Sequence, residues 1–430
     1  MTKIKKIEAR EILSSGSYPT IEVKVTLSST MVGIASVPFG VSAGSHEAFT
    51  LIDNDQKRFL GKGMLKAVEN VNKKIAPKLI GMEPYDQREI DRIMIELDGT
   101  ENKSNLGGNS ILAVSLAVAK AAANERMIPF YQYIRETFRI YGEWRLPNPM
   151  MVVIEGGKHA DNSTDIQEYC VSTFGEKTAT ENVRMGIEIY QILKKILIEN
   201  GLNTNVGNEG AFAPSGLMSN EIPLKLITEA IKKSGYNPLE NVGISIDAAA
   251  SEFFRDGKYH LKIEDKKLSS EELIEYYLPW IQKYPIVTIE DMLSEDDWEN
   301  WPLLMEKMPG ILNIGDDLTV TNIKRLEKAI NTRSINAILI KPNQIGTLTE
   351  CIDCCLFAKN NGIVTIVSHR GGGETNDTTM VDIAVAVNSS FIKVGPSRGE
   401  RVCKYNRLME IEDELGEMAK PVGKDFKKVL

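Results

Sequence analysis

The chain has 430 residues, of which 42% are hydrophobic and 26% charged, and its formal net charge is −8. Acidic and basic residues are interspersed, so the chain lacks the basic face that nucleic-acid-binding proteins carry. No apolar run reaches the ~18 residues that a membrane span needs, and the first residues lack the apolar core of a signal peptide. We therefore expect a cytoplasmic protein of two domains, with neither nucleic acid nor a membrane as partner.

The first part of the chain predicts a small domain of mixed α and β structure. Polar and apolar residues alternate in "IKKIEAREIL" (4–13), "YPTIEVKVTLSS" (18–29) and "MVGIASVP" (31–38). This alternation is typical of an antiparallel meander with one polar face. The later segment "NSILAVSLAVAKAAANE" (109–125) is nearly all alanine and aliphatic, which predicts a buried helix. We assign residues 1–135 to this N-terminal α+β capping domain.

After residue 150, short β-type runs alternate with helical stretches, as in βα units around a parallel sheet. We assign residues 140–430 to this second domain. Six successive runs end in or carry charged residues, namely "VGISID", "IVTIED", "ILNIGDD", "NAILIK", "IVTIVSHR" and "SSFIKVG". In a (β/α)8 barrel these ends meet at one mouth, where active sites lie. A doubly wound open sheet would collect them along one edge instead.

Three consecutive runs end in carboxylates, Asp247, Glu290 and Asp316. Carboxylates held close together do not all stay ionised without a cation. Oxygen ligands without cysteine favour a hard metal ion, most simply Mg²⁺. We therefore predict that these three residues form a magnesium site.

The next strand ends carry Lys341 and Lys393. Nearby positive charges lower the pKa of a lysine, which would make either residue a plausible general base. A metal together with a lysine base suggests removal of a proton next to a carboxylate. In "TNVGNEGAFAP", Glu209 lies between glycines and is a candidate general acid for a leaving hydroxyl.

Two glycine-containing segments add candidate substrate contacts. "IEGGKHADNSTDIQEY" carries His159, Gln167 and Glu168, whereas "TIVSHRGGGETND" brings His369 and Arg370 to a strand end just before Gly371. Glycines allow backbone N–H groups to approach a ligand closely, and an adjacent arginine suits an anion. These features predict an anionic substrate.

The chain resembles the enolase (phosphopyruvate hydratase) family over essentially its whole length. The resemblance rests on long segments: "LDGTENKSNLGGNSILAVSLAVAKAAA", "IEDMLSEDDW", "GDDLTVTN", "IKPNQIGTLTE" and "RGERVCKYNRLMEIEDEL". It implies an α/β fold, a modified (β/α)8 barrel with an N-terminal α+β cap. It also implies a Mg²⁺-dependent hydro-lyase of glycolysis that converts 2-phosphoglycerate to phosphoenolpyruvate, and a homodimer or larger homo-oligomer.

The resemblance also implies roles for individual residues. Asp247, Glu290 and Asp316 would bind Mg²⁺, and Lys341 would take the proton from C2 of the substrate. The implied catalytic residues are Lys341, Glu209, Glu168, His159, His369 and Lys393. The implied substrate contacts are His159, Gln167, Glu168, Lys341, His369, Arg370, Gly371 and Lys393, with Arg370 at the phosphate.

The chain departs from the family pattern mainly where the phosphate would bind. The family reads "SHRSGETED" and "PSGASTG", whereas this chain reads "SHRGGGETND" and "PFGVSAG". Gly371 thus replaces a phosphate-binding serine, and Phe39 replaces the serine that binds a second Mg²⁺; phenylalanine offers no oxygen ligand. Near the acid, "GDEGGF" has become "GNEGAF", with Asn208, and "NGG" begins with Glu155.

Three functions therefore stay open from the sequence. The first is the enolase reaction itself. The second is an enolase paralogue that performs the same chemistry on a related phosphono or carboxyphosphono acid. The third is a non-catalytic binding protein that retains the fold.

Overall fold

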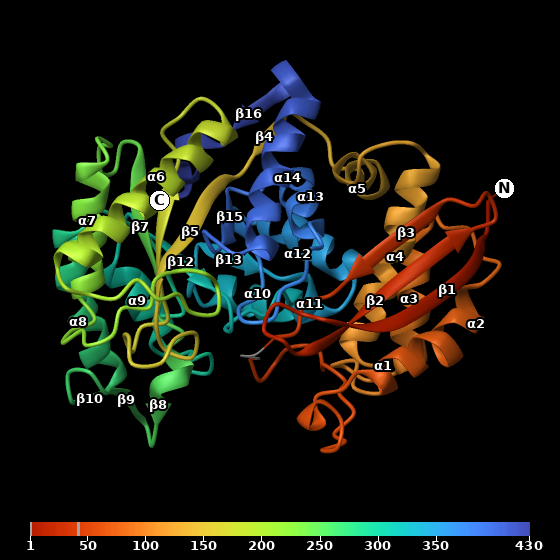
Figure 1. Ribbon diagram of the computed structural model, residues 1–430, viewed down its shortest axis with the longest axis horizontal. Helices are drawn as coiled ribbons and strands as arrows, with labels where there is room; N and C mark the ends of the chain where they lie inside the picture. Colours follow the sequence, from red (N-terminus) through yellow and green to blue (C-terminus); the bar gives the residue numbers. More distant parts are fainter. Residues whose placement is uncertain (1, 41–43) are drawn as a thin grey trace.

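The computed structural model describes residues 2–40 and 44–430, so Val41, Ser42 and Ala43 of the "PFGVSAG" segment lie outside the described residues. The N-terminal part contains the predicted antiparallel meander, in the order β1-β2-β3, packed on one side by helices (Figure 1). Its elements are β1 (Ile4–Leu13), β2 (Pro19–Leu27), β3 (Val32–Ser36), α1 (Leu65–Asn70), α2 (Ala76–Leu79), α3 (Gln87–Asp98), α4 (Gly108–Glu125) and α5 (Phe130–Phe138).

Helix α4 forms the centre of this layer, as its alanine-rich sequence predicts. Nearly every residue from Gly108 to Ala123 is buried, and the helix packs against β2 and β3. Small side chains let a helix and a sheet approach closely while each excludes water from the other.

The remainder of the chain forms a closed eight-stranded barrel in the order β11-β12-β13-β14-β15-β5-β6-β7. Most neighbouring strands are parallel, but β6 is antiparallel to both β5 and β7. The sequence pattern predicted parallel strands throughout, because alternation of β and helical runs does not reveal a reversed strand. The strands are β5 (Asn148–Glu155), β6 (Glu168–Thr173), β7 (Val242–Asp247), β11 (Ile286–Glu290), β12 (Leu312–Gly315), β13 (Ala337–Ile340), β14 (Val364–Ser368) and β15 (Phe391–Val394).

Helices and short sheets surround the barrel (Figure 1). Several helices begin at side-chain caps that satisfy free backbone N–H groups; Ser269, for example, forms a capping box with Glu272. Among the described residues, no helix is long and apolar enough to cross a membrane. The helices are α6 (Ala179–Glu199), α7 (Ile222–Lys233), α8 (Ser270–Lys283), α9 (Trp301–Lys307), α10 (Ile323–Asn331), α11 (Pro342–Ile345), α12 (Leu348–Asn360), α13 (Thr379–Ala386) and α14 (Gly399–Leu415). The short strands are β8 (Phe254–Arg255), β9 (Lys258–Leu261), β10 (Lys266–Leu268), β4 (Trp144–Leu146) and β16 (Ala419–Pro421).

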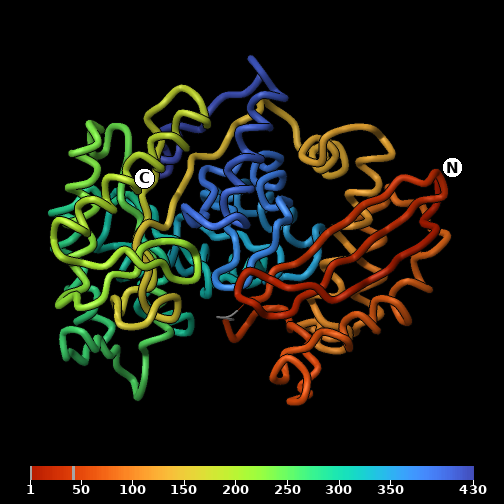
Figure 2. The backbone as a smooth tube through the Cα atoms, in the orientation of Figure 1, coloured from red at the N-terminus to blue at the C-terminus, as the bar shows by residue number. Residues whose placement is uncertain are grey.

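The N-terminal part reaches the mouth of the barrel through its loops. Figure 2 shows the N-terminal segment beside the later, blue part of the chain. The backbone N–H of Ser15 donates to the carbonyl of Glu374 at 2.7 Å, and that of Phe39 donates to the carbonyl of Gly373 at 2.8 Å. The glycine-rich loop after β14 is therefore held from outside by the cap.

Candidate active site

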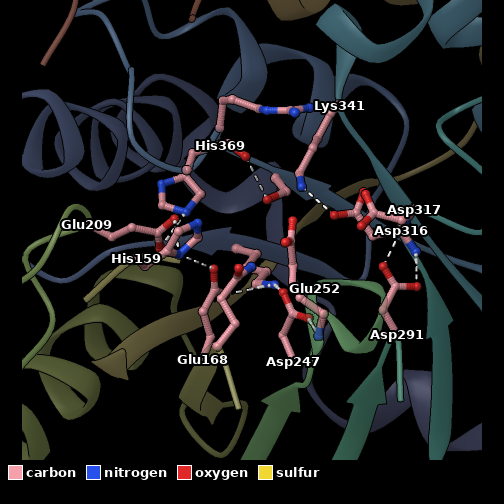
Figure 3. A pocket seen from close by; sticks show the side chains of 16 residues that line it. His159, Glu168, Glu209, Asp247, Glu252, Asp291, Asp316, Asp317, Lys341 and His369 are labelled. Carbon is pink, nitrogen blue, oxygen red and sulfur yellow. Dashed lines mark hydrogen bonds and ion pairs between the residues drawn. The ribbon is translucent and has the colours of Figure 1, made fainter. Parts of the chain in front are cut away.

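A polar cleft lies at the mouth of the barrel (Figure 3). All the residues that the sequence predicts for the site line this cleft, apart from Glu290, which is buried beneath it. The lining also includes residues that the sequence analysis did not assign: Ala249, Glu252, Asp291, Asp317 and Ser368. Parallel strands deliver these side chains from their carboxyl ends, and β6, which is reversed, delivers Glu168 from its first residue.

Lys393 of β15 lies at the centre of a buried carboxylate group. Its Nζ donates to Asp247 Oδ2 at 2.9 Å and to Glu290 Oε2 at 2.8 Å, and it lies 2.9 Å from Glu168 Oε2. Burial opposes the charge of the ammonium group, but the surrounding carboxylates outweigh burial and raise the pKa of Lys393 well above its usual value. Lys393 is therefore a fixed cation.

The predicted metal ligands offer oxygen atoms suited to a hard cation. Glu290 Oε1 is buried and has no hydrogen-bond partner among the described residues. Burial, and then the nearby charge of Asp247, raise the pKa of Glu290 well above its usual value. Asp316 is engaged elsewhere: its Oδ1 accepts from Gln344 Nε2 at 2.7 Å, and its Oδ2 pairs with Lys341. An orphaned carboxylate oxygen among carboxylates that repel one another fits a divalent ion.

Among the described residues, the possible metal ligands whose atoms lie closest together are not the predicted set of Asp247, Glu290 and Asp316. Within residues 2–40 and 44–430, three such groups have ligand atoms within 4.8 Å of one another: His46–Glu295–Asp296, His159–Glu168–Glu209 and Asp291–Asp316–Asp317. In the last group, Asp291 already accepts the backbone N–H groups of Asp316 at 3.1 Å and Asp317 at 2.7 Å. A shared site of Asp247, Glu290 and Asp316 stays a prediction.

The pKa of Lys341 is shifted in the opposite direction from the one that the sequence predicts. We expected neighbouring cations to lower its pKa. Burial does act in that direction, but the adjacent carboxylate of Asp316 outweighs it and raises the pKa of Lys341 above its usual value. The reason is distance: Asp316 makes a direct ion pair with Lys341.

Two histidines and two glutamates form the opposite wall of the cleft. His159 Nδ1 lies 3.2 Å from Glu168 Oε1 and 3.5 Å from Glu209 Oε1, and His369 Nε2 lies 3.1 Å from Glu209 Oε2. Burial opposes a charge on His159, but Glu209 and Glu168 raise its pKa to about 9. Burial would raise the pKa of Glu209, yet His369 and His159 hold it well below its usual value. At neutral pH the group therefore carries a protonated His159 and an ionised Glu209.

The two residues predicted to contact the substrate anion, Arg370 and Gly371, already have close neighbours in the protein. Arg370 is buried, and its Nη1 donates to Glu47 Oε2 at 2.8 Å. A Cβ atom on Gly371 would lie 2.7 Å from His159 Nε2 and 2.8 Å from Glu209 Oε1. The backbone of the loop at Gly371 therefore lies directly against the side chains of His159 and Glu209. The sequence analysis did not assign Glu47, because no local pattern links it to a residue that is 323 positions away.

Phe39 does not line the cleft. Its ring packs against Tyr18, with centroids 5.2 Å apart, and Lys62 Nζ lies 3.8 Å from the centroid of the Tyr18 ring. The ring of Phe39 is thus accommodated against Tyr18, while its backbone contacts Gly373 of the glycine-rich loop.

A capped β/α barrel with carboxylates, lysines and histidines at its mouth defines a class of enzyme that moves protons on small acidic substrates. Comparison with known families places the chain within this class. The model described as "Enolase, N-terminal domain" matches residues 4–134, and "Enolase, C-terminal TIM barrel domain" matches residues 143–430. The chain belongs to the enolase family. The fold expected from the resemblance, a modified barrel with an N-terminal cap, is confirmed.

Proposed function

We propose that this protein is a Mg²⁺-dependent hydro-lyase that removes the proton on the carbon next to a carboxylate and then eliminates water. The proposed substrate is 2-phosphoglycerate, and the product is phosphoenolpyruvate. The observation that carries the proposal is that two proton-handling groups face each other across one cleft (Figure 3): Lys341 stands on one side, and Glu209 lies between His159 and His369 on the other.

Lys341 acts as the base that accepts the C2 proton. The pair with Asp316 raises its pKa, so this role would require the Asp316 carboxylate to bind the metal ion instead of Lys341. Its Nζ projects into the cleft beside Asp316, at the end of β13. Lys393 stays charged among Asp247, Glu290 and Glu168, so it binds and orients the substrate carboxylate. The two lysines differ in role because Lys393 contacts three carboxylates, whereas Lys341, among the described residues, pairs with Asp316 alone.

Glu209 assists the departure of the C3 hydroxyl, with Glu168 and His159 beside it. Because His159 has a pKa of about 9, it holds the proton of this group at neutral pH, and Glu209 lies 3.5 Å from it. A proton that passes to the leaving hydroxyl turns a poor leaving group into water. Gln167, His369, Arg370 and the Gly371 backbone complete the substrate contacts.

Asp247, Glu290 and Asp316 would hold the Mg²⁺ ion. When bound, the ion supplies positive charge that stabilises the substrate carboxylate as negative charge builds up on it and that competes with Lys341 for Asp316. The orphaned Glu290 oxygen supports this assignment.

A second candidate is the same chemistry on a phosphono or carboxyphosphono acid. The observation that favours it is the position of Gly371: a serine in this loop conformation would collide with His159 and Glu209. Together with Phe39, which lacks an oxygen ligand, this favours a substrate whose distal anion differs from an ordinary phosphate.

The deciding experiment measures two activities on each substrate in the presence of Mg²⁺. One is the exchange of the C2 proton in D₂O, and the other is elimination to the enol product. Ordinary turnover of 2-phosphoglycerate supports the first candidate. Exchange or elimination confined to the phosphono acid supports the second. A protein that binds either acid but exchanges no proton is the non-catalytic alternative, and both proposals then fail.

A further inference from the structure

A buried carboxylate that plays no part in the steps above lies directly beneath the Glu209 loop. Glu155 is the last residue of β5, and it is fully buried. Its Oε1 and Oε2 accept the backbone N–H of Glu209 at 3.2 and 3.1 Å, and its Oε1 also accepts the N–H of Ala211 at 3.1 Å. These contacts are made to the backbone of Glu209 itself, the residue proposed to assist departure of the C3 hydroxyl.

The loop is shaped to receive this carboxyl group. A Cβ atom on Gly207 would lie 2.5 Å from Glu155 Cδ, so a side chain at this position would displace the carboxylate. The backbone of Glu155 also donates to the carbonyl of Phe212 at 2.9 Å. Glu155 thus binds the loop through both its main chain and its side chain.

Other groups around Glu155 belong to the same network. It faces Glu168 across β5 and β6 in register, and His159 follows it in the loop after β5. From α6, Tyr190 donates to the carbonyl of Gly210 at 2.8 Å. Burial, followed by the charge of Glu209, raises the pKa of Glu155 to about 8. A carboxyl group kept in such surroundings needs compensating contacts, and the loop N–H groups supply them.

A carboxyl group near Glu209 stands at a different position of the chain than in the family pattern. "GDEGGF" has lost a carboxyl group at Asn208, whereas "NGG" has gained one at Glu155. The number of carboxyl groups near Glu209 is therefore unchanged, but the second one now comes from the end of a barrel strand.

We propose that Glu155 is a positioning residue for Glu209: its carboxyl group accepts the backbone N–H groups of the loop and fixes the Glu209 side chain between His159 and His369. The proposal rests on the function proposed above for Glu209. The position of an acid matters greatly, because a displacement of about 1 Å in a catalytic group can lower the rate by about 10²-fold.

The test compares Glu155→Gln and Glu155→Asp with the unchanged protein. The glutamine keeps the shape but turns an amide N–H₂ towards backbone donors. The aspartate keeps a carboxyl group but withdraws it by one methylene. In both variants, elimination should fall by about 10²-fold, whereas C2 exchange, which depends on Lys341 on the other side of the cleft, should change by less than about threefold.

Glu412→Gln is the matched control. Glu412 also accepts backbone N–H groups, from Ala179 at 2.7 Å and Thr180 at 2.8 Å, but it does so at the start of α6, outside the cleft. This variant should lose a similar kind of contact and leave the ratio of exchange to elimination unchanged. Equal losses of exchange and elimination in the Glu155 variants would overturn the proposal.

A second readout needs no turnover. Burial lowers the pKa of His369 below its usual value, and the Glu209 carboxylate, 3.1 Å from Nε2, partly offsets this effect. The chain has four histidines, so their NMR titrations can be separated. If Glu155→Asp lets Glu209 move away, the pKa of His369 falls further, although a carboxyl group is retained at residue 155.

An unchanged His369 titration in Glu155→Asp would refute the positioning role. If the unmodified protein neither exchanges nor eliminates, the proposed function fails, and the His369 titration still decides whether Glu155 positions Glu209. If Glu155→Gln does not fold, the same measurements on Glu155→Asp decide.

Discussion

The guanidinium of Arg370 donates a hydrogen bond to the carboxylate of Glu47 at 2.8 Å, and both side chains are almost fully buried. A residue from the cap thus compensates the charge that we expect to bind the distal anion of the substrate. Glu47→Gln should therefore strengthen binding of 2-phosphoglycerate by about tenfold, because a charge-assisted contact of Arg370 becomes available to the ligand. Calorimetric titration measures this change. Glu295→Gln, which loses contacts to Ser45 of the same segment, is the control. Unchanged or weaker binding in Glu47→Gln would contradict the expectation.

Substitutions on the two sides of the cleft should affect different steps, proton exchange on the Lys341 side and elimination on the Glu209 side. Lys341→Ala should abolish exchange of the C2 proton with solvent deuterium and lower turnover by about 10²- to 10⁴-fold, because the base is lost. Glu209→Gln should lower elimination but leave part of the exchange, because the base remains. NMR of the substrate in D₂O measures both. Exchange that persists in Lys341→Ala would assign the base elsewhere, with Lys393 as the next candidate.

Glu290→Gln tests the proposed metal site without a turnover assay. The substitution replaces a charged ligand oxygen with an amide, so affinity for a divalent ion should fall by about 10- to 100-fold. Titration with Mn²⁺, followed by electron paramagnetic resonance, reports the affinity directly. Asp353→Asn changes a carboxylate at the contact with Arg88, outside every candidate group of metal ligands among the described residues, and serves as the control. Equal Mn²⁺ affinities of Glu290→Gln and the unchanged protein would exclude Glu290 as a ligand.

The loop after β14 should tolerate a serine only after it has been shortened. Gly371→Ser alone should lower activity, because its Cβ would lie 2.7 Å from His159 Nε2. The combined change of Phe39→Ser, Gly371→Ser and removal of one glycine should raise turnover of 2-phosphoglycerate, because it restores the loop length and the two hydroxyl groups of the family pattern. Steady-state kinetics of the single and combined variants provide the comparison. Ordinary turnover of 2-phosphoglycerate by the unchanged protein, with two bound Mg²⁺ ions, would show that the loop already compensates.

Turnover should decline above about pH 9. The pKa of His159 is raised from 6.5 to about 9, so its contribution to stability is fully present below pH 6.5, and its proton is lost as the pH rises through 9. The favourable contact of protonated His159 with Glu168 and Glu209 disappears over the same interval, together with its contribution to stability. A pH–rate profile measures this alkaline limb, and the control is His159→Gln, which should lack it. The same limb in both proteins would show that another group causes the decline.

Much of the barrel could be predicted from the sequence because its signal is local. A β-branched run that ends in a charged residue identifies a strand and its end, so Asp247, Glu290, Lys341 and His369 could be placed at one mouth from the chain alone. The direction of β6 could not be predicted, because a strand has the same alternation of side chains whichever way it runs.

The contacts that set the charges of the site could not be predicted either. The contacts of Lys393 with Glu168, Asp247 and Glu290 require three strands to close around it, and the pair of Arg370 with Glu47 requires the cap to dock. The pKa of Lys341 was misjudged for this reason: the nearest charge, that of Asp316, comes from a neighbouring strand end. The limits of the two domains, 1–135 and 140–430, and the homo-oligomeric state stay predictions.

The reversed strand β6 has a consequence for where the chain can be cut and rejoined. Because β6 runs away from the mouth, the connection of residues 156–167 lies at the mouth, where His159 and Gln167 line the cleft. The turn after Thr173 lies at the opposite rim, beside the start of β7. New chain ends placed at residues 175–177 would therefore interrupt the connection between β6 and α6 on the side remote from the cleft and leave the paired strands intact. A circular permutant with its new ends there should keep the arrangement of the cleft residues although their order along the chain has changed.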